Sequence, residues 1–186
     1  MPVPRPCLPP IPILETARLQ LRAHTEADFP AMVAMWADPG VVRYLGSTPQ
    51  SSQETWIRYL RYLGHWAHLG YGYWAIEERA TGRFVGEAGF ADYHRLTVPH
   101  VALAPEIGWV LAADAQGKGY ATEAVQAMLA WGATAFGKAR AVRCLIERGH
   151  TASRHVALKC GFIDFALVEY QSLPAWVLEL QPAVER

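Results

Sequence analysis

The segment from Glu106 to Glu123 combines residue types that can hold an anion. An apolar, strand-like stretch ends, the glycine pair of Gln116-Gly-Lys-Gly119 turns the chain, and a helix is expected at about 121–136. The first amides of a helix lack internal partners and lie at the positive end of its dipole. Glycines let an anion approach the backbone closely. The segment therefore predicts a pyrophosphate-binding loop with Lys118 as an added charge, unless the glycines only pack a strand against a helix.

Two common phosphate-binding motifs do not match this segment. A P-loop needs Gly-x-x-x-x-Gly-Lys-Ser/Thr, which the sequence lacks. A dinucleotide fingerprint needs a third glycine, but Thr122 stands at that place, and no acidic residue ends a following strand. A nucleotide-binding enzyme is therefore only an alternative, which competition by ATP or NAD would support.

The composition excludes several classes of protein. The 186 residues are enough for one ordinary domain, and 17 Lys and Arg balance 17 Asp and Glu, so nucleic acid is not an expected partner. Cys7, Cys144 and Cys160 form no Cys-x-x-Cys pair, which argues against disulfides or a cysteine zinc site. No stretch reaches the roughly 18 apolar residues of a membrane helix. We expect a cytoplasmic protein without a membrane partner.

The order of expected elements predicts a mixed α/β fold of the α+β kind. Residues 1–12 contain six prolines and are expected to form an extended arm before a single domain at 13–186. Alternation and apolar runs predict seven strands, at 18–22, 72–78, 83–90, 103–111, 141–147, 162–170 and 175–180. Helical spacing predicts four helices, at 29–37, from Ser51 or Ser52 to Gly70, at 121–136 and at 152–160.

A family resemblance joins these features. Gln116-x-x-Gly119-x-Ala121 matches the acyl-CoA pyrophosphate motif of the GNAT acetyltransferase superfamily, Gln/Arg-x-x-Gly-x-Gly/Ala. The longer stretch from Gly117 to Ala124 resembles the branch that acts on N-terminal amines of ribosomal proteins. The resemblance covers about Ile13 to Leu180. Further segments that resemble this branch, in order, are Glu15–Arg22, Trp74–Glu77, Thr81–Gly86, Glu106–Trp109 and Thr151–Phe162.

The resemblance implies a single GNAT domain that binds acetyl-CoA. Its central mixed sheet of about seven strands would be flanked by about four helices and would splay between strands 4 and 5, at 106–111 and 141–147. The pantetheine arm would lie in that gap. The amide of Val110 or Leu111 would lie near the acetyl carbonyl. The resemblance further assigns pantetheine contacts to the backbone of Val110, Leu111 and Ala112, and pyrophosphate contacts to Gln116, Gly117, Lys118, Gly119, Tyr120, Ala121 and Thr122.

The resemblance also implies direct attack of an amine on the thioester. Glu106 is the candidate base, acting through water, and Glu87 is the second candidate; either could instead be a paired structural carboxylate. Ser153 matches the serine that similar enzymes place near the sulfur, and it could alternatively cap the helix at 152–160. His150 replaces the asparagine that the family has at this position, and we interpret it as a retained cofactor contact. Gln116 replaces the tryptophan common in this branch.

The sequence therefore predicts an acetyl-CoA-dependent N-acetyltransferase that acts in a ternary complex. The acceptor would be a primary amine, either a protein N-terminus or a small amine, and a homodimer remains open. The alternative is a catalytically silent acyl-CoA sensor or interaction module. His65-x-x-His68 has no third ligand, so no metal is expected. The aromatic residues from Trp56 to Trp74 favour packing in the core over a substrate groove.

Overall fold

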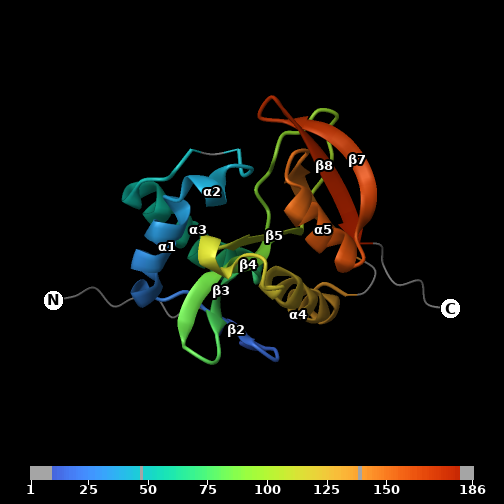
Figure 1. Ribbon diagram of the computed structural model, residues 1–186. Helices are drawn as coiled ribbons and strands as arrows, with labels where there is room; N and C mark the ends of the chain where they lie inside the picture. Colours follow the sequence, from blue (N-terminus) through green and yellow to red (C-terminus); the bar gives the residue numbers. More distant parts are fainter. Residues whose placement is uncertain (1–9, 47, 138–139, 181–186) are drawn as a thin grey trace.

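The computed structural model describes residues 10–46, 48–137 and 140–180. Eight strands form one open sheet in the order β1-β2-β3-β4-β5-β6-β8-β7 (Figure 1). All neighbouring strands are antiparallel except β5 and β6, which are parallel. The strands are β1 (Leu14–Glu15), β2 (Leu19–Arg22), β3 (Tyr73–Glu78), β4 (Arg83–Ala91), β5 (Glu106–Leu111), β6 (Val142–Glu147), β7 (Ile163–Tyr170) and β8 (Leu173–Leu180).

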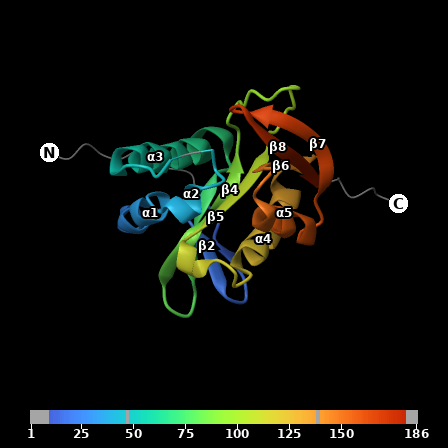
Figure 2. The same ribbon diagram turned by 45° about the horizontal axis from the view of Figure 1, so that its top comes forward.

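Five α-helices cover the sheet (Figures 1 and 2). They are α1 (Phe29–Trp36), α2 (Pro39–Val42), α3 (Ser52–Leu69), α4 (Tyr120–Ala135) and α5 (Thr151–Lys159), with 3-10 turns at Glu26–Asp28 and Ala113–Ala115. Neighbouring residues of a strand face opposite sides of the sheet. In β3, Trp74 packs in the core formed with α4, while Tyr73 packs against α1 and α3. Two helical layers therefore enclose the sheet.

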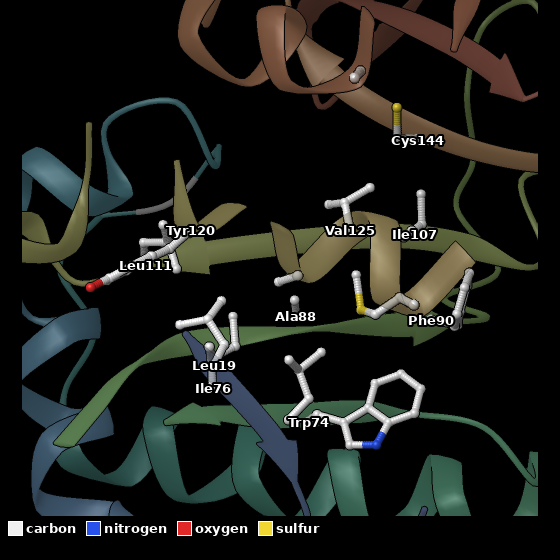
Figure 3. Packing of buried hydrophobic residues seen from close by; sticks show 14 of the residues in the cluster. Leu19, Trp74, Ile76, Ala88, Phe90, Ile107, Leu111, Tyr120, Val125 and Cys144 are labelled. Atoms are coloured by element: carbon white, nitrogen blue, oxygen red, sulfur yellow. The ribbon is translucent and has the colours of Figure 1, made fainter. Parts of the chain in front are cut away.

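The larger core lies between α4 and the sheet. Figure 3 shows Val125 of α4 among buried side chains of β3, β4 and β5. Trp74, Ile76, Phe90 and Ile107 are almost completely buried there. This core anchors β5, and with it the chain that leads from β5 into α4.

The sequence signals for helix ends explain two boundaries. Ser51 and Glu54 form a capping box at the start of α3, and Gly70 ends this helix with a φ of 73°. Asp38-Pro39-Gly40 ends α1 as predicted but also starts α2, which was not predicted. Asp38 accepts a hydrogen bond from the Gly40 amide at 2.7 Å, and Pro39 occupies the first helical position.

Other boundaries differ from the predictions by a few residues. The predicted strand at 103–111 starts only at Glu106, because Pro105 has no amide to donate to a ladder. The two-residue β1 was missed and brings the sheet to eight strands. Most of the predicted N-terminal arm, with Cys7, lies outside the described residues. Pro12 at its end accepts a hydrogen bond from Trp74 Nε1 at 2.8 Å.

The sheet splays where the sequence predicted. Strands β4 and β5 pair over six positions, from Gly86 with Leu111 to Ala91 with Glu106. Strands β5 and β6 pair only between Glu106 and Arg143. The edge of β5 beyond Glu106 is therefore left without a neighbouring strand. Within the described parts of the chain, no helix combines the length and hydropathy needed to cross a bilayer.

Candidate active site

A cavity of about 390 Å³ lies where β5 and β6 diverge. Its wall includes residues 106–110 of β5, residues 144–147 of β6, and His150 and Ser153 from the start of α5. The structure therefore brings four predicted site residues, which are far apart in the sequence, to one cavity: Glu106, Val110, His150 and Ser153.

The glycine loop, residues 116–122, leads from β5 into α4. Gly117 and Gly119 have φ values of 74° and 80°, in the left-handed region that favours glycine. The first hydrogen bond of α4 runs from the Glu123 amide to the Gly119 carbonyl at 3.2 Å. The preceding amides therefore have no intrahelical partner. These amides belong to Tyr120, Ala121 and Thr122.

The two polar side chains of the glycine loop have different surroundings. Gln116 Nε2 donates to the Leu111 carbonyl at 3.1 Å, so this side chain closes the turn. Lys118 is exposed, and its carbonyl accepts from Arg18 Nη1 at 2.9 Å. Residues 116–119 are all exposed and lie outside the cavity wall. The loop is thus open for a ligand that extends beyond the cavity.

Arg18 and Glu123 hold the glycine loop against the sheet, a role that sequence reasoning missed. Glu123 Oε1 accepts hydrogen bonds from the Arg18 amide at 2.8 Å and from Thr16 Oγ1 at 2.6 Å. Arg18 Nε donates to Glu123 Oε2 at 2.7 Å. Burial favours the neutral form of Glu123, but these hydrogen bonds outweigh it and lower its pKa. The two residues are 105 positions apart, so no local pattern connects them.

The register of β4 and β5 decides which backbone amides of the predicted contact residues face the open edge of β5. The Ala112 amide donates to the Val85 carbonyl at 3.0 Å, so it is paired with β4. Backbone groups of successive residues point to alternate sides of an antiparallel strand. Val110, which pairs with Glu87, therefore also directs its amide to β4. Of the three predicted residues only Leu111 directs its amide to the open edge, together with Trp109, which was not predicted.

Glu106 lies at the closed end of the splay, where β5 and β6 make their single pair, and is bound by an arginine. Arg95 Nε donates to its Oε2 at 2.7 Å, and Arg95 Nη2 donates to its Oε1 at 2.9 Å. Arg95 Nη1 also donates to the Tyr170 hydroxyl at 2.7 Å. Burial raises the pKa of Glu106, while the hydrogen bonds from Arg95 act against this rise. Arg95 was missed because it belongs to the irregular segment before β5.

Glu87, the second candidate base, is completely buried behind the cavity wall. Its Oε1 accepts hydrogen bonds from Trp36 Nε1 at 3.0 Å and from the Tyr62 hydroxyl. Its Oε2 faces His24 Nε2 at 3.6 Å. Trp36 and Tyr62 line the cavity, whereas Glu87 and His24 do not. Glu87 therefore fixes two wall residues and has no direct path to a substrate.

His150 and Ser153 occupy the first turn of α5. His150, not Ser153, is the N-cap residue, so the alternative of Ser153 as a helix cap is wrong. The His150 ring stacks on Tyr44 with centroids 4.8 Å apart, and burial lowers its pKa. The stacked His150 and Ser153 thus both line the cavity from the start of α5.

A group of side chains that we call the α3 wall forms the cavity surface opposite β6. Its members are Trp36, Arg58, Arg61, Tyr62, Tyr73 and Tyr93. The Tyr62 and Tyr73 rings stack with centroids 4.6 Å apart. The expectation that the aromatic run serves the core is confirmed for Trp66 and Trp74, and also for Tyr62 and Tyr73, which are buried in the core on the α3 side of the sheet and in addition line the cavity.

The fold and the cavity have the features expected of an acetyltransferase of the GNAT class. The family model described as an acetyltransferase (GNAT) domain matches residues 18–163. The chain belongs to this family, and the family resemblance drawn from the sequence is confirmed.

Individual proteins resemble this chain in sequence or in fold. The uncharacterized N-acetyltransferase YoaA of Bacillus subtilis is 32% identical over 152 residues, 81% of this chain and 82% of that protein. The acetyltransferase structure from Agrobacterium tumefaciens is 27% identical, with a TM-score of 0.77 over 95% of this chain and 98% of its own. The ribosomal L7/L12 α-N-protein acetyltransferase RimL, solved with coenzyme A, is 19% identical with a TM-score of 0.73 over 92% and 99% of the two chains.

The residues around the splay fit an acyl-CoA ligand. A Cβ added at Gly117 would have no atom within 4 Å, which leaves room above the turn for a phosphate. Three helix amides without intrahelical partners lie beside it. The edge of β5 beyond Glu106 has no neighbouring strand and can pair with an amide-bearing ligand.

Proposed function

We propose that the chain transfers an acetyl group from acetyl-CoA to a primary amine, by direct attack of the amine in a ternary complex. This proposal rests mainly on the divergence of β5 and β6, which pair only at Glu106 and Arg143. The edge of β5 is therefore open beside the cavity, on the strand that leads to the glycine loop. Bound acetyl-CoA supplies an activated acetyl thioester. The acceptor is either a protein N-terminus or a small amine.

The chain would bind the cosubstrate mostly through its backbone. We assign the diphosphate to the amides of the glycine loop, where Lys118 and the dipole of α4 add positive potential. The amides of Trp109 and Leu111 point to the open edge and are assigned to the pantetheine arm and the acetyl oxygen. A backbone donor near that oxygen would stabilise the negative charge that develops there during attack.

Glu106 is the proposed base. An ionised carboxylate has about four acceptor sites, of which Arg95 uses two, so a water can still hydrogen-bond to Glu106. Its raised pKa makes the carboxylate a stronger base. The ammonium of the acceptor would pass one proton to Glu106 through this water before the nitrogen attacks.

Ser153 is the proposed donor to the leaving sulfur. Its hydroxyl can hydrogen-bond the thiolate as the C–S bond breaks. The nitrogen loses a second proton after its attack, which finally resides on the free thiol, while Glu106 releases the first proton to solvent. His150 would orient the ligand from the adjacent turn. Its ring is held by Tyr44 and is neutral near pH 7, because burial lowers its pKa.

Calorimetric titration with CoA and acetyl-CoA, followed by a thiol-release assay over a panel of amines, tests this function. We expect binding and thiol release with one class of amine. Ser153→Ala should lower the rate and leave the affinity for CoA unchanged. A catalytically silent sensor would bind CoA but release no thiol with any amine, so Ser153→Ala would have no thiol-release rate to lower. Displacement of acetyl-CoA by ATP or NAD would favour a nucleotide-binding enzyme instead.

A further inference from the structure

Two arginines place positive charge on the α3 wall of the cavity. Arg58 and Arg61 lie three residues apart on α3 and therefore share one face of the helix. Both line the cavity, Arg58 half-buried and Arg61 exposed at the rim. Among the described residues, neither arginine is part of an ion pair.

Among the described residues, Arg58 is held in place by contacts other than a direct ion pair with a carboxylate. Its guanidinium lies 3.5 Å from the centroid of the Trp36 ring. Its Nε donates to Gln50 Oε1 at 3.2 Å, and its Nη1 lies 3.5 Å from the Tyr62 hydroxyl. A guanidinium has five N–H donors, so most of them remain available to a ligand.

The acidic residues near the cavity leave the α3 wall positive. Glu106 is neutralised by Arg95. Glu147 lines the cavity from the end of β6, on the opposite side from α3. Glu87 lies behind the wall, where Trp36 and Tyr62 bind one of its oxygens. Burial lowers the pKa of Arg58, but its interactions with Tyr62 and Glu87 outweigh burial and raise it, so one buried carboxylate partly offsets the charge of two arginines. A ligand that reaches α3 therefore meets two arginines and several tyrosine side chains.

We propose that the acceptor is a small amine that carries a carboxylate, bound by Arg58 and Arg61. This inference rests on the proposed function and narrows its acceptor to one chemical class. A guanidinium binds a carboxylate through two parallel hydrogen bonds, and its position on Trp36 preorganises this contact. With the carboxylate on α3, the amine extends towards the open edge of β5. The same arginines repel a polycationic amine such as spermidine.

The test is calorimetry on the CoA-saturated protein with matched pairs of amines. Each pair consists of an L-amino acid, or 4-aminobutyrate, and the amine that remains when its carboxylate is removed; spermidine is the cationic probe. We expect at least one carboxylate-bearing member to bind at least tenfold more tightly than its partner. Arg58→Gln should abolish this preference, and Arg58→Lys should retain part of it, because lysine keeps the charge but not the planar donor geometry.

The matched control is Arg79→Gln, which removes an exposed arginine that does not line the cavity. It should leave the preference unchanged. Equal binding within every pair, tighter binding of spermidine, or an unaltered preference in Arg58→Gln would overturn the proposal. Failure to bind CoA in the first titration would instead reject the proposed function. Acetylation of carboxylate-free amines at equal rates would retain the transferase and reject the acceptor class.

Discussion

The glycine loop consists of consecutive backbone groups, whereas the α3 wall consists of side chains from several separate elements. In the loop, two left-handed glycines and the first turn of α4 direct amides to one place. In the wall, Trp36, Tyr62 and Tyr73 come from α1, α3 and β3. A site made of consecutive backbone groups, as we propose for the cosubstrate, can therefore be local in sequence, whereas a site made of side chains from separate elements, as we propose for the acceptor, cannot.

The largest effect should come from Glu106, which lines the cavity at the start of β5, the strand that leads to the glycine loop. Glu106→Gln removes the proposed base but retains the volume of the side chain, so kcat should fall roughly 100- to 10,000-fold. The affinity for CoA should not change. The loss is measured by thiol release at saturating acceptor, with CoA titration as the control. An unchanged kcat would show that a group other than Glu106 acts as the base.

The pH dependence of activity gives a second test of Glu106 as the base. Because burial raises the pKa of Glu106, its proton is lost only above the ordinary glutamate value of about 4.3. Activity of the wild type should therefore rise with pH through a limb that lies above this value. The Glu106→Gln variant should lack this limb, and a limb that persists in the variant belongs to a different group.

The variant Gly119→Val tests whether the glycine loop binds CoA through its backbone. The φ of 80° at Gly119 is strained for any residue with a Cβ, which would also lie 3.4 Å from Arg18 Nη2. With a cost of about 1–3 kcal/mol for the left-handed conformation, the affinity for CoA should fall roughly 10- to 100-fold. Gly82→Val is the matched control, since Gly82 has a φ of 68° in the turn between β3 and β4. An equal effect of both variants on CoA affinity would indicate general loss of stability.

Glu123→Gln tests whether side chains support the loop. Charged hydrogen bonds contribute about 1.5–3 kcal/mol and less where they are partly exposed, so the affinity for CoA should fall about three- to tenfold. The lowered pKa of Glu123 also stabilises the fold above its unfolded pKa of about 4.3. This stabilisation is lost as the pH falls through the folded pKa. Acid unfolding should therefore be less steep in the variant, while Glu77→Gln, which breaks an Arg22 pair away from the loop, should not affect CoA binding.

Trp36→Phe should have the smallest kinetic effect and should affect only the α3 wall. It removes the indole donor to the buried Glu87 carboxylate, which should lower the free energy of unfolding by about 1–3 kcal/mol. Phenylalanine makes a weaker cation–π interaction with Arg58 than the indole does, so the KM for the acceptor should rise about threefold. The affinity for CoA should stay constant. Denaturant unfolding and acceptor kinetics check this, and Trp56→Phe, on the part of α3 outside the cavity, is the control.

Much of the fold was predictable because its signals are local. The capping box of Ser51 and Glu54 and the glycine at position 70 define the ends of α3 from neighbouring residues. The helix of α2 was missed because Asp38-Pro39-Gly40 is equally consistent with the end of one helix and the start of the next. Its N-cap hydrogen bond depends on the path of the chain after α1.

The sequence by itself determined the glycine loop, since a left-handed turn before a helix requires only adjacent residues with the right conformational freedom. Only the tertiary structure decided which backbone amides face the splay, because the register with β4 turns Val110 and Ala112 away and leaves Trp109 and Leu111. It also decided that Arg95 pairs with Glu106 and that Arg58 has no such partner. Such pairings depend on contacts between distant segments, whose free energy is gained only when the core has brought these segments together.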